Sequence, residues 1–150
     1  MTGMELLYEP ARPEDAEAIL TFAEDLVRRY EDPARIDLDE VFAWMRRKVT
    51  VRIGEYVRVT ADGKTAAYYR FAPADGRMEL DDLYVLPEFR GRGIGTGIVQ
   101  RCCGSTGKPV FLYVFRGNER AVALYERLGF RIVEEVGETR LIMQRDGAAR

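Results

Sequence analysis

The residues with the clearest chemical potential form a glycine-rich segment, Arg90-Gly91-Arg92-Gly93-Ile94-Gly95, followed by Thr96. The segment comes after a β-rich stretch and Pro87, and directly before an apolar stretch of helical character. Glycines permit a tight turn and a close backbone approach to a ligand. The free N–H groups at a helix start attract anions, helped by the positive end of the helix dipole. Because Arg90 and Arg92 add positive charge there, the segment predicts a phosphate or pyrophosphate site.

The glycine spacing excludes the two commonest nucleotide loops. A dinucleotide fingerprint needs G-x-G-x-x-G, but the sixth position counted from each glycine of the segment is Thr96, Ile98 or Gln100. A P-loop needs G-x-x-x-x-G-K-[ST], but Gly107-Lys108 is followed by Pro109 and lacks the first glycine. A tight connection without a ligand is the plain alternative, although alternating glycines flanked by arginines exceed what such a turn requires.

The chain contains no histidine, and its two cysteines, Cys102 and Cys103, are adjacent. The missing histidines exclude Ser-His-Asp and Cys-His nucleophile pairs. Adjacent thiols are poor ligands for one metal ion, so no metal site is expected. A disulfide between neighbours is strained, which favours a reducing cytoplasm as the location. Any acid or base must therefore come from Glu, Asp, Tyr, Lys or Cys.

Composition places the chain among folded domains. A length of 150 residues predicts a single domain over 1–150, and 47% hydrophobic with 32% charged residues predicts a packed core. The net charge of −2 argues against a nucleic-acid binder, which usually carries a basic excess. Apolar runs are too short for a membrane span, and no secretory signal pattern opens the sequence.

The elements that must position these residues follow from hydrophobic periodicity and turn residues. Their predicted order is βααβββαβαββ, with strand–helix–strand units flanked by meanders, which indicates an α/β (α+β) fold with a mixed sheet covered by helices. We expect strands near 5–8, 51–60, 65–71, 77–85, 108–115, 130–134 and 139–144, and helices near 12–31, 38–48, 94–103 and 118–128.

Two segments together resemble the GCN5-related N-acetyltransferase (GNAT) superfamily. Its signature [Q/R]-x-x-G-x-[G/A] is met by Arg90, Gly93 and Gly95, and its pattern N-x-x-A-x-x-x-Y-x-x-x-G-F is met from Asn118 to Phe130. The resemblance is good over 77–144 and rests on element order before that. It implies a mostly antiparallel sheet of about seven strands flanked by about four helices, in which the fourth strand is bulged and splays from the fifth.

The resemblance also implies acetyl-CoA as cosubstrate. The pantetheine arm would then pair with the backbone of Leu83, Tyr84 and Val85, and the pyrophosphate would take the backbone amides of Gly91 to Thr96. Asn118, a good N-cap by itself, would also hydrogen-bond the cofactor. Tyr125 would protonate the departing thiolate, although alone it fits a core aromatic equally well.

The base that neutralises the substrate amine is expected on the strand before the turn. Glu79 lies eleven residues before Arg90, the spacing of the glutamate base in histone-acetylating members. Strand alternation predicts that Asp81 faces the same side and Asp82 the opposite side. The alternatives are that Asp81 or a water chain is the base, or that these carboxylates are merely solvated or attract a cationic substrate. Tyr113 stands where members that acetylate N-terminal alanine carry a glutamate, so their mechanism does not transfer.

The resulting hypothesis is an N-acetyltransferase that moves acetyl from acetyl-CoA to a primary amine by direct attack in a ternary complex. The acceptor is a small-molecule amine or a protein or peptide amine, with neither nucleic acid nor membrane as partner, and the patterns are compatible with a homodimer. The alternative is a catalytically silent acyl-CoA-binding or sensor module, which would need neither Glu79 nor Tyr125. The resemblance also implies that the acceptor site is built by the first two helices, the loop between them at 30–38, and the loop between the last two strands at 135–138. Acidic residues in and beside these loops favour a cationic acceptor: Glu31, Asp32, Asp37, Glu134, Glu135 and Glu138.

Overall fold

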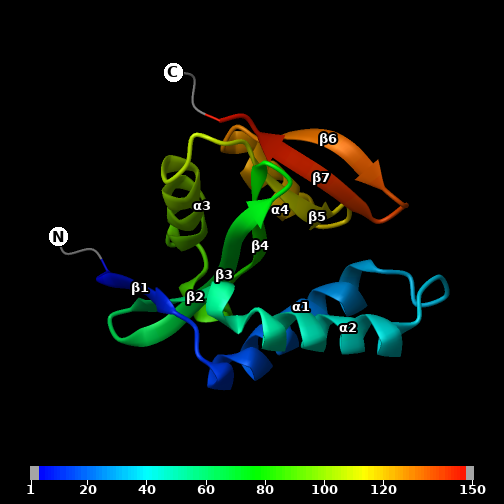
Figure 1. Ribbon diagram of the computed structural model, residues 1–150, viewed down its shortest axis with the longest axis horizontal. Helices are drawn as coiled ribbons and strands as arrows, with labels where there is room; N and C mark the ends of the chain where they lie inside the picture. Colours follow the sequence, from blue (N-terminus) through cyan, green and yellow to red (C-terminus); the bar gives the residue numbers. More distant parts are fainter. Residues whose placement is uncertain (1–3, 148–150) are drawn as a thin grey trace.

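The computed structural model describes residues 4–147. They form a seven-stranded mixed sheet in the order β1-β2-β3-β4-β5-β7-β6 (Figure 1), in which β4 and β5 are parallel neighbours and the other pairs are antiparallel. The strands are β1 (Leu6–Pro10), β2 (Tyr56–Ala61), β3 (Lys64–Ala74), β4 (Arg77–Val85), β5 (Val110–Phe115), β6 (Arg131–Val136) and β7 (Arg140–Arg145). The α-helices are α1 (Ala16–Tyr30), α2 (Leu38–Val51), α3 (Ile94–Gly104) and α4 (Glu119–Arg127), with short 3-10 turns η1 (Pro13–Asp15), η2 (Ile53–Glu55) and η3 (Pro87–Phe89). This architecture confirms the predicted fold class.

The sheet carries a separate core on each face. On one face, Leu20 of α1 and Val49 of α2 pack with Tyr56 and Tyr68 of the sheet. On the other face, α3 and α4 pack against the central strands, with Ile98 fully buried. Burying an apolar stripe of each helix against the sheet is the standard solution for a domain of this kind. Within residues 4–147, no helix combines the length and the hydropathy needed to cross a bilayer.

Two element boundaries differ from the sequence prediction. The strand expected over 51–60 begins only at Tyr56, because α2 continues to Val51 and η2 follows. Met45 and Val49 are buried and Ile53 packs beside them, so the apolar spacing of a helix continues past the expected end. The last turn is also shorter than expected, since β6 extends to Val136 and includes Glu135.

A cluster of charged side chains joins α2 to the sheet beneath it. The Arg70 side chain is only 6% exposed, and its guanidinium lies 2.7 Å from Glu55, 3.3 Å from Asp81 and 3.5 Å from Glu79. Lys48 of α2 contacts the Asp81 carboxylate as well. Charges this far removed from water need partners, so the cluster ties α2 and η2 to β3 and β4.

Replacing Arg70 with methionine tests how much this cluster stabilises the fold. We expect the free energy of unfolding to fall by about 3 kcal/mol near neutral pH, because three carboxylates lose their shared cation. The loss should shrink as the pH falls below about 5, since in the variant the folded-state carboxylates then bind protons more readily than those of the unfolded chain. Urea unfolding at the two pH values measures both effects.

Arg35→Met is the matched control. Arg35 pairs with Glu138 at 2.6 Å, but the side chains are 61% and 68% exposed. Its loss should cost less than about 1 kcal/mol, as is usual for surface pairs. Equal losses in the two variants would contradict a special role for the Arg70 cluster.

Candidate active site

The sheet opens between β4 and β5. The two strands pair only at Met78 with Val110 and at Glu79 with Phe111, and no further pairs join them. Beyond that point β4 stays paired with β3 as far as Val85, while β5 pairs with β7. The side of β4 that faces β5 therefore carries backbone groups without a strand partner among the described residues, which is the splay that was expected.

A bulge in β4 lies just inside this opening. The register with β3 shifts by one residue between the pairs Arg70–Asp81 and Tyr68–Tyr84, so that two residues of β4, Asp82 and Leu83, stand opposite one. Asp82 has φ of 49°, in the left-handed region. The prediction that Asp82 faces away from Asp81 is wrong, because Lys48 contacts both carboxylates. The extra residue of the bulge breaks the alternation on which that prediction depended.

The glycine-rich turn follows the end of β4. Gly91 and Gly93 have φ of 76° and 81°, and a Cβ at either position would meet nothing within 4 Å, so the turn is open to a ligand. The first intrahelical bond of α3 runs from the Gly97 N–H to the Gly93 carbonyl, at 2.9 Å. The amides of Ile94 to Thr96 precede it and have no partner within the helix. This is the geometry of an anion site at a helix start.

The turn is held directly against β4. Arg90 donates from Nε to the Val85 carbonyl at 3.1 Å and from Nη2 to the Tyr84 hydroxyl at 2.8 Å. An added Cβ at Gly95 would stand 3.7 Å from the Val85 side chain. Arg92 is exposed, with its guanidinium 5.6 Å from the centre of the Phe89 ring. The open backbone of β4 and the candidate anion site therefore form one continuous surface.

Tyr125 and Asn118 come from the helix on the α3 face. The Asn118 Oδ1 accepts a hydrogen bond from the Ala121 N–H at 3.4 Å, which confirms its role as N-cap. Tyr125 is 9% exposed and packs edge-on against Phe130. Burial raises the pKa of Tyr125 to about 12. The phenol therefore keeps a proton that it can donate.

Glu79 sits where β4 and β5 part, on the face covered by α1 and α2. Its side chain is 19% exposed, and burial, reinforced by the Asp81 charge, raises the pKa of Glu79. The Asp81 carboxylate forms ion pairs with both Lys48 and Arg70, whereas the ion pair of Glu79 is with Arg70, at 3.5 Å. Between these two carboxylates, the geometry leaves Glu79 freer to take a proton.

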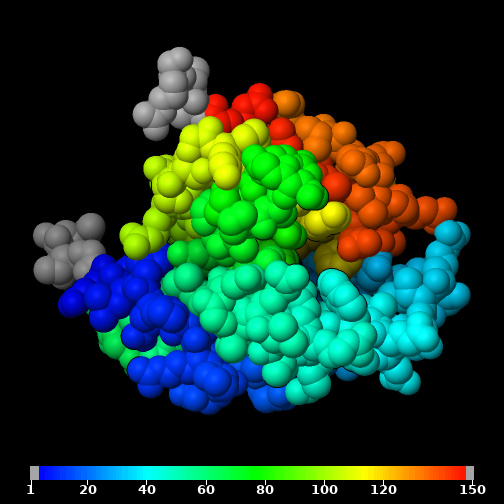
Figure 2. Space-filling view, viewed as in Figure 1, coloured from blue at the N-terminus to red at the C-terminus, as the bar shows by residue number. Residues whose placement is uncertain are grey.

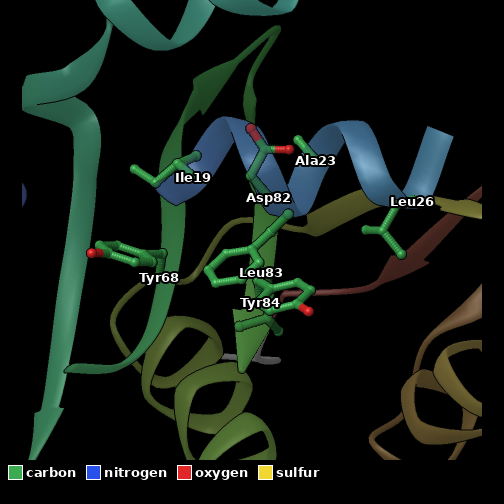
Figure 3. Close-up of a pocket in the computed structure, with 8 residues that line it drawn as sticks. Ile19, Ala23, Leu26, Tyr68, Asp82, Leu83 and Tyr84 are labelled. Carbon is green, nitrogen blue, oxygen red and sulfur yellow. The ribbon is translucent and has the colours of Figure 1, made fainter. Parts of the chain in front are cut away.

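A small hollow separates α1 from the bulged part of β4, and Figure 3 shows its lining. Phe22 of α1 stacks on Tyr84 with ring centres 3.7 Å apart. Asp82 also lines the hollow, and its carboxylate accepts a hydrogen bond from the Tyr56 hydroxyl at 2.6 Å. The volume of the hollow is about 20 Å³, which is room for about one water molecule.

The loops expected to surround an acceptor touch each other, as Figure 2 shows for the light-blue α1–α2 connection and the orange β6–β7 turn. Arg35 pairs with Glu138 at 2.6 Å, and Arg116 pairs with Glu135 at 3.1 Å. Thr139 donates a hydrogen bond to Glu31. Much of the acidity noted in the sequence is thus matched by arginines, which a count of carboxylates alone did not include.

Three further site residues were not predicted from the sequence: Lys48, Tyr56 and Arg70. The position of Lys48 could have been recognised from the sequence. Lys48 lies three residues after Met45 on the inner side of α2, where an apolar residue is expected. A lysine at such a position needs a buried anion beside it.

Comparison with known proteins gives several relatives, of which two of the three described here are named acetyltransferases. A Bacillus subtilis protein, spore coat polysaccharide biosynthesis protein SpsD, is 29% identical over 81% of the chain and 45% of its own length. Mycothiol acetyltransferase of Nocardia farcinica is 32% identical over 53% of the chain and 26% of its own length. Mouse thialysine N-epsilon-acetyltransferase is 37% identical over 45% of the chain and 43% of its own length. The chain thus spans less than half the length of each of these relatives.

Solved structures share the fold across nearly the whole chain. A PaiA N-acetyltransferase of Thermoplasma acidophilum, in complex with coenzyme A, has a TM-score of 0.71 at 18% identity and covers 95% of this chain and 99% of its own. The ribosomal-protein-S18-alanine N-acetyltransferase of Escherichia coli has a TM-score of 0.67 at 20% identity and covers 97% of this chain and 96% of its own. At these identities the likeness concerns the fold.

The model of the acetyltransferase (GNAT) family matches residues 19–130, a stretch that runs from α1 to the end of the second signature. It includes the splayed strands, the open glycine turn and the helix of Tyr125. The protein therefore belongs to the acetyltransferase (GNAT) family.

Proposed function

We propose that the protein is an acetyl-CoA-dependent N-acetyltransferase that acetylates a primary amine by direct attack in a ternary complex. The observation that carries the proposal is the opening between β4 and β5, which leads directly into the glycine turn at the start of α3. The unpaired strand edge fits the amide-containing arm of a ligand, and the adjoining anion site fits its pyrophosphate. The coenzyme A complex of a structural neighbour supports this choice of ligand.

Each part of the cofactor can be assigned to groups of this chain. The backbone of Leu83, Tyr84 and Val85 would pair with the pantetheine arm. The amides of Gly91, Arg92, Gly93, Ile94, Gly95 and Thr96 would bind the pyrophosphate, with Arg90 bracing the turn. Asn118 would offer its side-chain amide beside the arm while its oxygen caps α4. Acetyl-CoA supplies the activated thioester.

Groups of the chain then accept one proton, stabilise one developing negative charge and donate one proton. Glu79 takes a proton from the substrate ammonium, directly or through water, so that the neutral amine can attack. A backbone N–H near Val85 stabilises the carbonyl oxygen as it gains negative charge, an effect typically worth about 3 kcal/mol per donor. Tyr125 donates its proton to the sulfur as the thiolate leaves.

The acceptor belongs to the class of primary amines, in a small molecule or in a protein or peptide. The relatives include a mycothiol acetyltransferase and a thialysine N-epsilon-acetyltransferase, and one structural neighbour is a ribosomal-protein-S18-alanine N-acetyltransferase. Two free cysteines, one of them buried, fit the reducing cytoplasm in which we place the enzyme.

A thiol-release assay with acetyl-CoA and a panel of amines tests the proposed activity. The panel should hold polyamines, aminoglycosides, free lysine and peptides with lysine or a free N-terminus. We expect turnover with at least one of these acceptors. Tight coenzyme A binding without turnover on any of them would instead support a silent acyl-CoA sensor.

Tyr125→Phe tests the proposed acid. We expect kcat to fall by about 100-fold, because general acid catalysis typically contributes two to four orders of magnitude, while the Kd for coenzyme A changes little. Tyr8→Phe removes a hydroxyl on β1, an edge strand that β2 and β3 separate from β4, and should leave turnover unchanged. Unchanged turnover in Tyr125→Phe would rule out this residue as the acid.

Glu79→Gln tests the proposed base through the pH profile. In the wild type, kcat/KM should rise with pH around an apparent pKa above the ordinary glutamate value of 4.5, since burial favours the protonated form and only the carboxylate accepts a proton. The glutamine variant should lose both activity and this pH dependence. Glu55→Gln disturbs the same Arg70 cluster and should keep the pH dependence. A profile that survives in Glu79→Gln would point to another base.

A further inference from the structure

Asp82 adopts a strained backbone conformation in the middle of a strand. Of the described residues other than glycine, Asp62, Asp75 and Asp82 have positive φ. Asp62 and Asp75 each precede a glycine in a hairpin turn, where the left-handed conformation is required. Asp82 has no such reason, and a left-handed L-residue costs about 1–2 kcal/mol. Something beyond turn geometry must stabilise it.

The side chain of Asp82 supplies that stabilisation through a tether to two other elements. Its Oδ2 accepts a hydrogen bond from the Tyr56 hydroxyl at 2.6 Å and lies 3.4 Å from the Lys48 ammonium. Tyr56 is fully buried at the start of β2, and Lys48 is 18% exposed on α2. Hydrogen bonds to a carboxylate in such surroundings are stronger than those between neutral groups.

The conformation of Asp82 decides how the rest of β4 is presented. Before the bulge, Asp81 stands opposite Arg70, and after it Tyr84 stands opposite Tyr68. Without the extra residue, every side chain from 83 onward would exchange faces. Tyr84 would lose its stacking on Phe22 and its bond from Arg90. The backbone groups that face the opening toward β5 would change as well.

We propose that Asp82 is a positioning residue, whose tether to Tyr56 and Lys48 fixes the β4 bulge and thereby the register of the cofactor-binding backbone. The proposal rests on the proposed function in one respect, namely that the cofactor lies along β4. Because Lys48 belongs to α2, the tether also joins the helix layer on one face of the sheet to the strand that receives the cofactor.

Asp82→Gly and Asp82→Asn separate the tether from the backbone conformation. Glycine adopts the left-handed region freely but cannot bind Tyr56 or Lys48. Asparagine tolerates that region and keeps an oxygen that accepts from Tyr56. If only the backbone mattered, glycine would be the better replacement. If the tether matters, asparagine will be the better replacement.

The measurement is calorimetric titration with coenzyme A. We expect the Kd to rise by about tenfold or more in Asp82→Gly, the scale of a lost hydrogen bond to a charged group, and by less in Asp82→Asn. Asp75→Gly is the matched control, because Asp75 has φ of 52° in a hairpin turn and is exposed. Its Kd should equal that of the wild type.

Amide hydrogen exchange without ligand gives an independent reading. Residues 83–85 should exchange faster in Asp82→Gly than in Asp82→Asn or Asp75→Gly. Wild-type affinity in Asp82→Gly, or tighter binding in Asp82→Gly than in Asp82→Asn, would overturn the proposal. A wild type that does not bind coenzyme A would instead contradict the proposed function, while the exchange rates would still test the tether.

Discussion

The early separation of β4 from β5 is the constraint on which the rest of the structure depends. Two strands in the middle of a sheet pair over two positions and then part, leaving backbone donors and acceptors that the sheet does not satisfy. Such an opening persists only if both faces are braced. On one face, α3 and α4 fill the space with a continuous apolar core, and on the other the charged cluster around Arg70 and Lys48 ties α2 to β4. The unpaired edge of β4 therefore remains accessible to a ligand.

The opening would also let groups from opposite faces of the sheet serve the proposed reaction. Glu79 lies on the face of α1 and α2, whereas Tyr125 lies in the core on the face of α3 and α4. In a closed sheet the strands would separate them. Where β4 and β5 part, a thioester between the strands could be approached by an amine from one side and receive a proton from the other. Burial raises the pKa of each group, which is the direction that suits the proposed base and the proposed acid.

Much of this arrangement could be predicted from the sequence, and the exceptions have physical reasons. Local signals sufficed for the element order, the glycine turn and the Asn118 cap, because periodicity, positive φ and capping are properties of neighbouring residues. The side faced by Asp82 was mispredicted, since the bulge depends on partners in α2 and β2 that lie far away along the chain. The start of β2 was placed too early because Ile53 fits a strand and a helix equally well. The acidic acceptor loops appeared unpaired because Arg35 and Arg116 reach them only through the fold.

Hydrogen exchange with and without coenzyme A tests most directly whether the opening between β4 and β5 is the cofactor site. Saturating ligand should slow amide exchange in two segments, residues 83–85 of β4 and residues 91–96 of the glycine turn, and should leave the β1–β2 pair unchanged. That result would join the unpaired strand edge and the anion site in one bound ligand. Saturable binding with protection elsewhere, and none in these two segments, would contradict it.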